Sequence, residues 1–240
     1  MHDKIKEIAK LFLYLPLKSE LGGLFVNHPF TNSYAWYNQE TKKLMNLQIP
    51  EVYNQWVEFM ATLIDNTADI RQIVMLMNDN YSFAFLKHIR KYLTDKELGY
   101  CLARALMKSE GVYDSDIFTS SQLIKLILKA DKSELMEESE LDTFNSLESK
   151  LTVYRGVNGR DRKSGKVGVD FWKGLSWTSD YKTAEWFAKR FVLGENKVEC
   201  VVYEAEIPRE LVLAVFEGED EVLVDVRKLS KDMIIRHVLD

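Results

Sequence analysis

Residues 218–224 read Gly-Glu-Asp-Glu-Val-Leu-Val, an acidic triplet that leads into an apolar run. The apolar run predicts a buried β-strand over residues 221–226. Because successive side chains of a strand point to opposite faces, Glu219 and Glu221 are predicted to project from the same face. Holding two carboxylates side by side costs free energy unless they face water, and a protein retains such a cost where the pair serves a function. This pair is therefore a candidate site.

Two further motifs lie upstream in predicted β-structure. Tyr154-Arg155-Gly156 closes a predicted strand over residues 151–155, and Ser176-Trp177-Thr178 lies within another over 174–179. An amphipathic helix is predicted over 180–192, because small and aromatic residues recur on one of its faces. Segments enriched in Val, Ile and Tyr predict three more strands over 198–207, 211–216 and 233–238.

The first half of the chain has helical patterns instead. Pro50 suits the first turn of a helix, and Thr94 with Glu97 forms a capping box for a helix that ends at Gly111. A last, acidic helix is predicted over 134–151, with the run 134–140 on its solvated face. These patterns predict an α+β protein with a helical region at 1–145 and a β-rich domain at 146–240.

Composition and spacing exclude several classes of function. The 240 residues carry a net charge of -5, which argues against a general nucleic-acid-binding surface but not against a local basic patch. The four His and two Cys residues are scattered, so no metal site is predicted. Nothing is long and apolar enough to cross a membrane, and the N-terminus reads as an amphipathic helix, not a signal peptide. A cytoplasmic location is therefore expected.

Two nucleotide-binding signatures are also missing. No Gly-x-Gly-x-x-Gly follows a predicted strand, so no Rossmann fold is expected. Gly165-Lys166 faintly suggests a phosphate-binding loop, but Val167 stands where that motif needs Ser or Thr. The segment 159–167 is therefore interpreted as a flexible basic loop that could touch an acidic substrate.

Taken in order, the three motifs resemble those of the ADP-ribosyltransferase superfamily, in its Arg-Ser-Glu branch. That branch has an Arg on a first strand, a Ser-Thr-Ser motif opening a second and a Glu-x-Glu motif on a later one. Arg155, Ser176-Trp177-Thr178 and Glu219-Asp220-Glu221 occupy these places here. The resemblance extends over residues 140–238, and the motifs are also similar to those of uncharacterised bacterial and phage proteins related to the superfamily.

The resemblance implies a mixed or antiparallel β-sandwich core that uses NAD as substrate. It implies cleavage of the nicotinamide–ribose bond and transfer of ADP-ribose to a protein arginine, through a transition state like an oxocarbenium ion. Glu221 would stabilise that state and Glu219 would orient or deprotonate the acceptor. Arg155 would hold the phosphates or ribose, and Ser176 would brace Glu221. NAD binding is expected to involve Arg155, Tyr154, Gly156, Ser176 and Thr178.

One departure from the pattern leaves alternatives open. Trp177 replaces the central Thr of Ser-Thr-Ser, although strand alternation would turn it toward the core and keep Ser176 and Thr178 on one face. A catalytically silent module that binds a partner protein is one alternative, and an NAD glycohydrolase is another. As an enzyme, the chain would be a phage or bacterial effector or toxin whose partner is a target protein, without a metal or nucleic acid.

Overall fold

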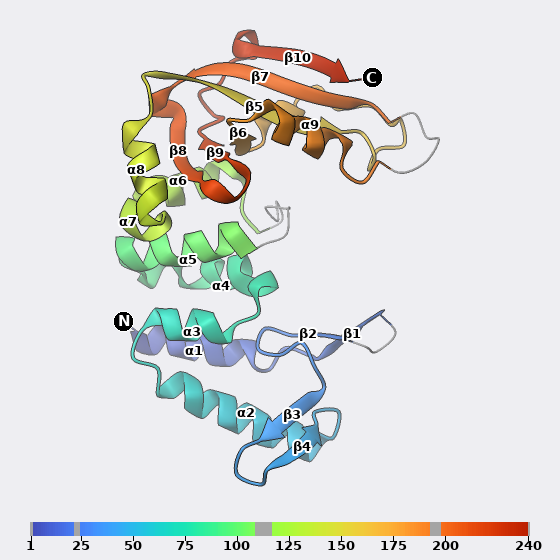
Figure 1. Cartoon of the computed structure of the whole chain (residues 1–240). Coiled ribbons are helices and arrows are strands. Elements are labelled where there is room, and N and C mark those ends of the chain that lie inside the picture. Colours follow the sequence, from blue (N-terminus) through green and yellow to red (C-terminus); the bar gives the residue numbers. More distant parts are fainter. Residues whose placement is uncertain (1, 22–24, 109–116, 193–197, 240) are drawn as a thin grey trace. The chain divides into compact units, whose positions relative to one another are not determined.

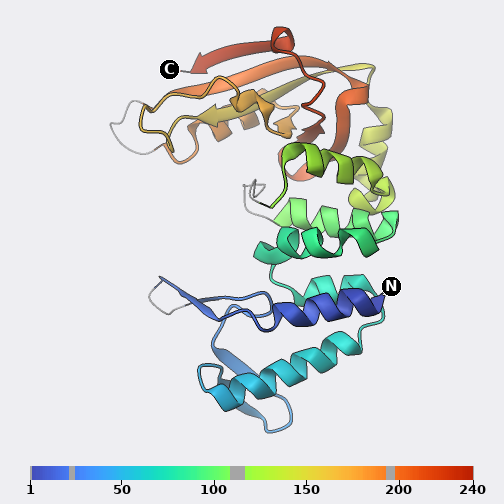
Figure 2. The same cartoon turned by 180° about the vertical axis from the view of Figure 1, so that it is seen from behind.

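The computed structural model describes residues 2–21, 25–108, 117–192 and 198–239. It divides into two compact units, residues 1–118 and 119–240, each with its own buried apolar core (Figure 1, and from behind in Figure 2). The predicted α+β class is confirmed, because the described residues form nine α-helices and one six-stranded antiparallel sheet.

The first unit is mainly helical, as predicted. Thr94 and Glu97 make the predicted capping box: the Thr94 amide donates to Glu97 Oε2 at 2.8 Å, and the Glu97 amide donates to Thr94 Oγ1 at 3.3 Å. Gly111, the predicted end of that helix, lies outside the described residues. The helices are α1 (His2–Phe12), α2 (Pro50–Asp65), α3 (Ile70–Leu76), α4 (Ser82–Ile89) and α5 (Asp95–Lys108).

Two small antiparallel hairpins interrupt the helices of this unit and were not predicted. Their strands are three or four residues long, too short to show a clear apolar alternation. At the second hairpin, Asn38 Oδ1 accepts hydrogen bonds from the amides of Glu40 and Thr41, which is ordinary turn chemistry. The strands are β1 (Lys18–Glu20) paired with β2 (Phe25–Asn27), and β3 (Ala35–Asn38) paired with β4 (Lys43–Asn46).

The second unit contains every strand predicted after residue 150. Its helices are α6 (Ser120–Lys129), α7 (Lys132–Leu135), α8 (Glu138–Ser146) and α9 (Tyr181–Lys189). Its strands are β5 (Lys150–Asn158), β6 (Ser176–Thr178), β7 (Cys200–Pro208), β8 (Val212–Phe216), β9 (Glu221–Val224) and β10 (Ile234–Leu239). One helix prediction is wrong: residues 134–151 do not form a single helix, because they are divided among α7, α8 and the start of β5.

The sheet has the strand order β10-β7-β5-β6-β9-β8, and all neighbours are antiparallel. Hydrogen bonding thus joins the described strands of this unit into one sheet, not into the two sheets of the expected sandwich. The two halves of the sheet are joined weakly, because β5 and β6 share only the pair Tyr154↔Thr178. In contrast, β5 and β7 are paired from Lys150↔Pro208 to Asn158↔Cys200.

Helices α6 to α8 belong to the second unit, so the boundary at 118/119 lies well before the expected 145/146. Their side chains bond to the backbone of β8 and the turn after it. Lys132 Nζ donates to the Leu213 carbonyl at 2.5 Å, and the Val215 amide donates to Met136 Sδ at 3.5 Å. Residues 119–146 therefore support the sheet that carries the candidate site.

Candidate functional site

The three motifs identified in the sequence lie on adjacent strands of the second unit. Arg155 is on β5, Ser176 opens β6 and Glu221 opens β9. The register pairs Tyr154 with Thr178, and Thr178 with Glu221, so these three residues form one row across the sheet. Residues opposite each other in antiparallel strands project to the same face. Segments up to 67 positions apart in the sequence are thus neighbours in the fold.

The guanidinium of Arg155 is fixed by the backbone that leads into β6. Its Nε donates to the Phe171 carbonyl at 3.1 Å, and its Nη1 donates to the Ser176 carbonyl at 2.5 Å. Gly174 makes this approach possible, since a Cβ there would lie 2.2 Å from Arg155 Cζ. Because β5 and β6 separate beyond their single pair, Arg155 spans the gap between the two halves of the sheet beside Ser176.

The Ser176-Trp177-Thr178 motif alternates as predicted. Trp177 is 2% exposed and its indole N–H donates to the Gly174 carbonyl at 2.9 Å, which confirms that this side chain points into the core. Ser176 is half-buried on the other face. Thr178, also on that face, donates from Oγ1 to the Glu219 carbonyl at 3.0 Å. The second motif thereby holds the third through a direct hydrogen bond.

The placement of Glu219 differs from the prediction. Glu219 does not precede Glu221 on a strand; it ends a short 3-10 helix over Glu217–Glu219, and Asp220 adopts a left-handed conformation with φ 48°. The alternation rule therefore does not apply between the two glutamates. Glu219 is exposed on this turn, whereas Glu221 is half-buried at the start of β9. A left-handed conformation is uncommon for a residue other than glycine and stores strain.

Glu140 fixes this turn and was missed at the level of sequence. It is 5% exposed, not part of a solvated face as expected for residues 134–140. Its Oε1 accepts the Glu217 amide at 3.1 Å, and its Oε2 accepts the Glu137 amide at 2.8 Å. The spacing Glu137-x-x-Glu140 is a capping-box signal, so the role of Glu140 at the start of α8 could be predicted from sequence. Its long-range contact with Glu217 could not.

Tyr154 and Gly156 lie against α9, so they have packing roles in this structure. The Tyr154 ring meets the Tyr181 ring edge-on with centroids 5.4 Å apart. A Cβ on Gly156 would lie 1.7 Å from the Ala184 carbonyl oxygen, so only glycine lets α9 approach β5 this closely. Alternation places the Arg155 side chain on the opposite face of β5 from both residues.

Helix α9 begins directly after the second motif and is firmly capped. Asp180 Oδ2 accepts hydrogen bonds from the Thr183 amide at 2.7 Å and from the Thr183 hydroxyl at 2.9 Å. These bonds hold the pKa of the Asp180 carboxyl below its usual value. The cap fixes the chain direction after β6, because the Asp180 amide also donates to Thr178 Oγ1 at 3.1 Å.

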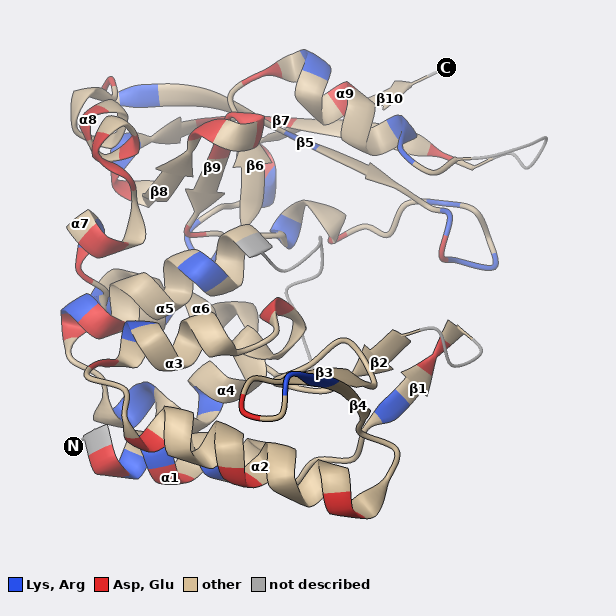
Figure 3. Cartoon of the chain, turned by 60° about the horizontal axis from the view of Figure 1, so that its bottom comes forward, with Lys and Arg blue, Asp and Glu red and all other residues tan. Residues whose placement is uncertain are grey.

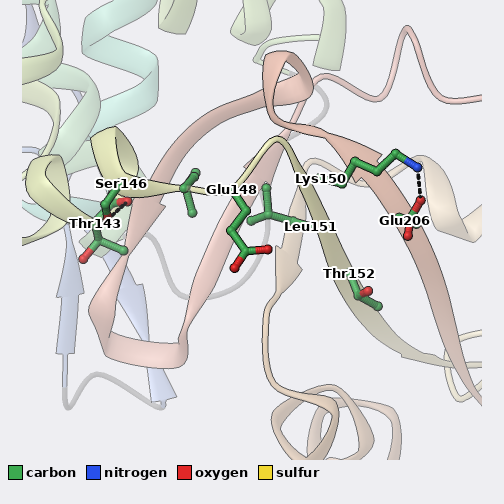
Figure 4. Close-up of a pocket in the computed structure, with 8 residues that line it drawn as sticks. Thr143, Ser146, Glu148, Lys150, Leu151, Thr152 and Glu206 are labelled. Carbon is green, nitrogen blue, oxygen red and sulfur yellow. Dashed lines mark hydrogen bonds and ion pairs between the residues drawn. The ribbon is translucent and has the colours of Figure 1, made fainter.

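A separate open groove of about 560 Å³ lies where α8 leads into β5 (Figure 4). No residue of the three motifs lines it. Lys150 and Glu206 form an exposed ion pair at 2.7 Å along one side, as Figure 4 shows. Such a pair contributes little energy and offers no reactive group, so the groove is not the candidate site. Its lining comprises Thr143, Ser146, Leu147, Glu148, Lys150, Leu151, Thr152 and Glu206.

Within the described ranges, no group of three or more His, Cys, Asp or Glu side chains is placed to hold a metal ion. No helix in the part of the chain that the structure describes has the length and apolar character needed to cross a bilayer. Comparisons with protein-family models, with curated proteins and with solved structures find no match to this chain.

Proposed function

We propose that the chain is a mono-ADP-ribosyltransferase that uses NAD and modifies a protein arginine. The adjacency of β5, β6 and β9 supports this proposal most strongly, because it brings Arg155, Ser176 and Glu221 to neighbouring strands, with Ser176 and Glu221 on one face and Arg155 turned by strand alternation to the other. The bond from Arg155 Nη1 to the Ser176 carbonyl adds a direct contact between the first two motifs. The three residue types suit a substrate with a diphosphate and a ribose that becomes cationic.

In the proposed reaction, the bond between the ribose and nicotinamide breaks and its electron pair leaves with nicotinamide. Positive charge then develops on the ribose, as it does in glycoside hydrolysis. Glu221 would accept a hydrogen bond from a ribose hydroxyl and stabilise this charge more in the transition state than in the ground state. Arg155 would bind the diphosphate or ribose, since a guanidinium matches the geometry of phosphate oxygens.

The acceptor step would involve Glu219. A nitrogen of the target arginine would form the new bond to the ribose, and its displaced proton would pass to the Glu219 carboxylate. The exposed turn suits this task, because a carboxylate that meets a second protein must be accessible. Thr178 would support the step indirectly, by holding the Glu219 carbonyl.

An NAD glycohydrolase, with water as the acceptor, is the second candidate. The observation that favours it is the position of Glu219 outside β9, since transfer to water needs Glu221 but no second carboxylate on the same strand face. The case for a silent binding module rested on Trp177. That case is weaker because the Trp177 side chain packs in the core and leaves Ser176 and Thr178 on the other face.

Labelled NAD separates these candidates. The purified chain is incubated with NAD labelled in the adenylate part and a bacterial lysate, and protein-bound label and released nicotinamide are both measured. The transferase proposal predicts both products from the wild type and neither from Glu221→Gln. Glu219→Gln should still release nicotinamide but should no longer label arginine.

Glu217→Gln is the matched control, because Glu217 lies in the same short helix, is equally exposed and has no assigned chemical role. It should retain both products. Nicotinamide release without labelled protein would favour the glycohydrolase. A wild type that releases no more nicotinamide than Glu221→Gln would contradict both enzymatic functions.

A further inference from the structure

The loop after β5 and the end of α9 carry an unusual concentration of positive charge. Residues 158–166 and 182–192 together contain seven Lys or Arg but only two Asp or Glu, in a chain whose net charge is -5. Figure 3 shows blue segments along this loop. The negative net charge of the whole chain therefore conceals a local basic surface, which is consistent with the local basic patch that the sequence does not exclude.

Exposed aromatic rings lie among these cations. Arg190 lies over Trp186 at 4.8 Å and over Phe191 at 4.4 Å, measured from Cζ to the ring centroid. Arg160, from the loop after β5, lies over Phe191 at 4.8 Å. The rings remain accessible, since Trp186 is 53% exposed and Phe191 is 58% exposed. We call these four residues, Arg160, Trp186, Arg190 and Phe191, the basic–aromatic patch.

The side-chain amide of Asn158 holds the two segments of the patch together. Asn158 Nδ2 donates to the carbonyls of Ala188 at 3.0 Å and Arg190 at 3.2 Å, which ties the end of β5 to the end of α9. Phe191 has φ 61°, a left-handed conformation that is costly for a bulky residue. The Phe191 ring packs against Arg160 and Arg190 and stays 58% exposed, and an exposed ring held at this cost is typical of a binding surface.

Further cations extend the patch along the loop. Arg162 lies over the Phe171 ring at 5.4 Å, and Lys163 and Lys166 follow in the same loop. The loop is itself ordered by backbone hydrogen bonds, from the Arg162 amide to the Gly159 carbonyl at 3.0 Å and from the Glu199 amide to the Gly165 carbonyl at 2.8 Å. The loop therefore adds positive charge to the patch, in which arginine side chains lie over two partly exposed rings.

We propose that the basic–aromatic patch binds single-stranded nucleic acid. The phosphates would contact Arg160, Arg190 and the loop cations, and bases would stack on Trp186 and Phe191. Proteins that bind single strands without sequence preference combine these two features. An acidic peptide would satisfy the charges but would leave the ring faces unused. The proposal does not depend on the NAD chemistry proposed above.

The test is the binding of the full chain to a fluorescein-labelled oligothymidylate of about 15 nucleotides, followed by fluorescence anisotropy. Binding should weaken steeply between about 50 and 200 mM salt, because counterions released from the phosphates drive it. Phe191→Gly should weaken binding about fivefold or more, and it removes the ring without backbone strain because glycine adopts the left-handed conformation readily. Trp186→Ala should have an effect of similar size.

Charge is tested by the double variant Arg160→Gln/Arg190→Gln, against the control Lys43→Gln/Lys125→Gln, which removes two exposed lysines elsewhere. The patch variant should bind about tenfold or more weakly and the control at most about twofold more weakly. Circular dichroism confirms that each variant is folded. No wild-type binding at low salt, equal losses in both double variants, or equally tight binding of polyglutamate would each overturn the proposal.

Discussion

Gly174 lies against the guanidinium of Arg155, and the absence of a side chain lets the two approach. A Cβ at this position would lie 2.2 Å from both Cζ and Nη2 of Arg155. Gly174→Ala should therefore displace the guanidinium from the Ser176 carbonyl. If Arg155 binds NAD, a displacement of this size should weaken NAD binding or turnover about 10- to 100-fold, which titration calorimetry and steady-state kinetics would measure.

Gly218→Ala is the control for this substitution, because no atom lies within 4 Å of a Cβ at Gly218. It should leave NAD binding and turnover unchanged. If Gly174→Ala behaves like Gly218→Ala, the position of the Arg155 guanidinium is not important for the site.

Lys132 makes stability depend on pH. Its ammonium donates to the Leu213 carbonyl at 2.5 Å and to the Ile127 carbonyl at 3.3 Å, and burial lowers its pKa to about 8. Burying the charged ammonium therefore lowers the free energy of unfolding. This penalty is full below pH 8 and disappears as the pH rises toward 10.5, the ordinary pKa of lysine. The penalty is about 1–3 kcal/mol once partial exposure is allowed for.

Urea unfolding of the wild type and of Lys132→Met, from pH 7 to 10.5, measures this effect. The wild type should gain stability relative to the variant across the window from pH 8 to 10.5, because only the wild type loses a proton there in the folded state. Two unfolding free energies that stay parallel through the window would show that Lys132 titrates normally.

At the scale of elements, the turn between β8 and β9 depends on α8. Glu140 accepts the Glu217 amide, and this turn then places Glu219 and Glu221. Glu140→Gln leaves one acceptor oxygen where two are used, so one buried amide should lose its partner at a cost of about 1–3 kcal/mol. Hydrogen exchange of the amides from Glu217 to Glu221 should accelerate. Glu138→Gln, an exposed neighbour on α8, should change neither quantity appreciably.

The strands of the second unit were predictable because apolar and β-branched residues mark them, as in the almost fully buried β7 and β8, and because motif order suggested which strands meet. The turn that carries Glu219 could not be predicted. It depends on the left-handed Asp220 and on a contact between Glu217 and Glu140, which lies 77 positions earlier in the sequence. The β1–β4 hairpins were missed because strands of three or four residues carry too little pattern. Asn38 was the available signal for the second of them.

At the scale of the whole molecule, the helices before β5 belong with the sheet. Lys132, Met136 and Glu140 all bond to β8 or the turn after it, and the second unit begins at residue 119. A fragment of residues 119–240 should therefore unfold cooperatively, whereas a fragment of residues 146–240 should not fold, because it lacks these contacts. Circular dichroism during thermal unfolding measures both, and cooperative unfolding of the shorter fragment would contradict this division.

The whole account depends on one chemical event, the release of nicotinamide from NAD at the site formed by the neighbouring strands β5, β6 and β9. Its rate can be followed by chromatography with the purified full chain and with Glu221→Gln. We predict measurable release by the wild type and a loss of about 100-fold or more in the variant, as when a single preorganised electrostatic group is removed from an active site. Equal rates for the two proteins, or no release by the wild type, would contradict the proposed site.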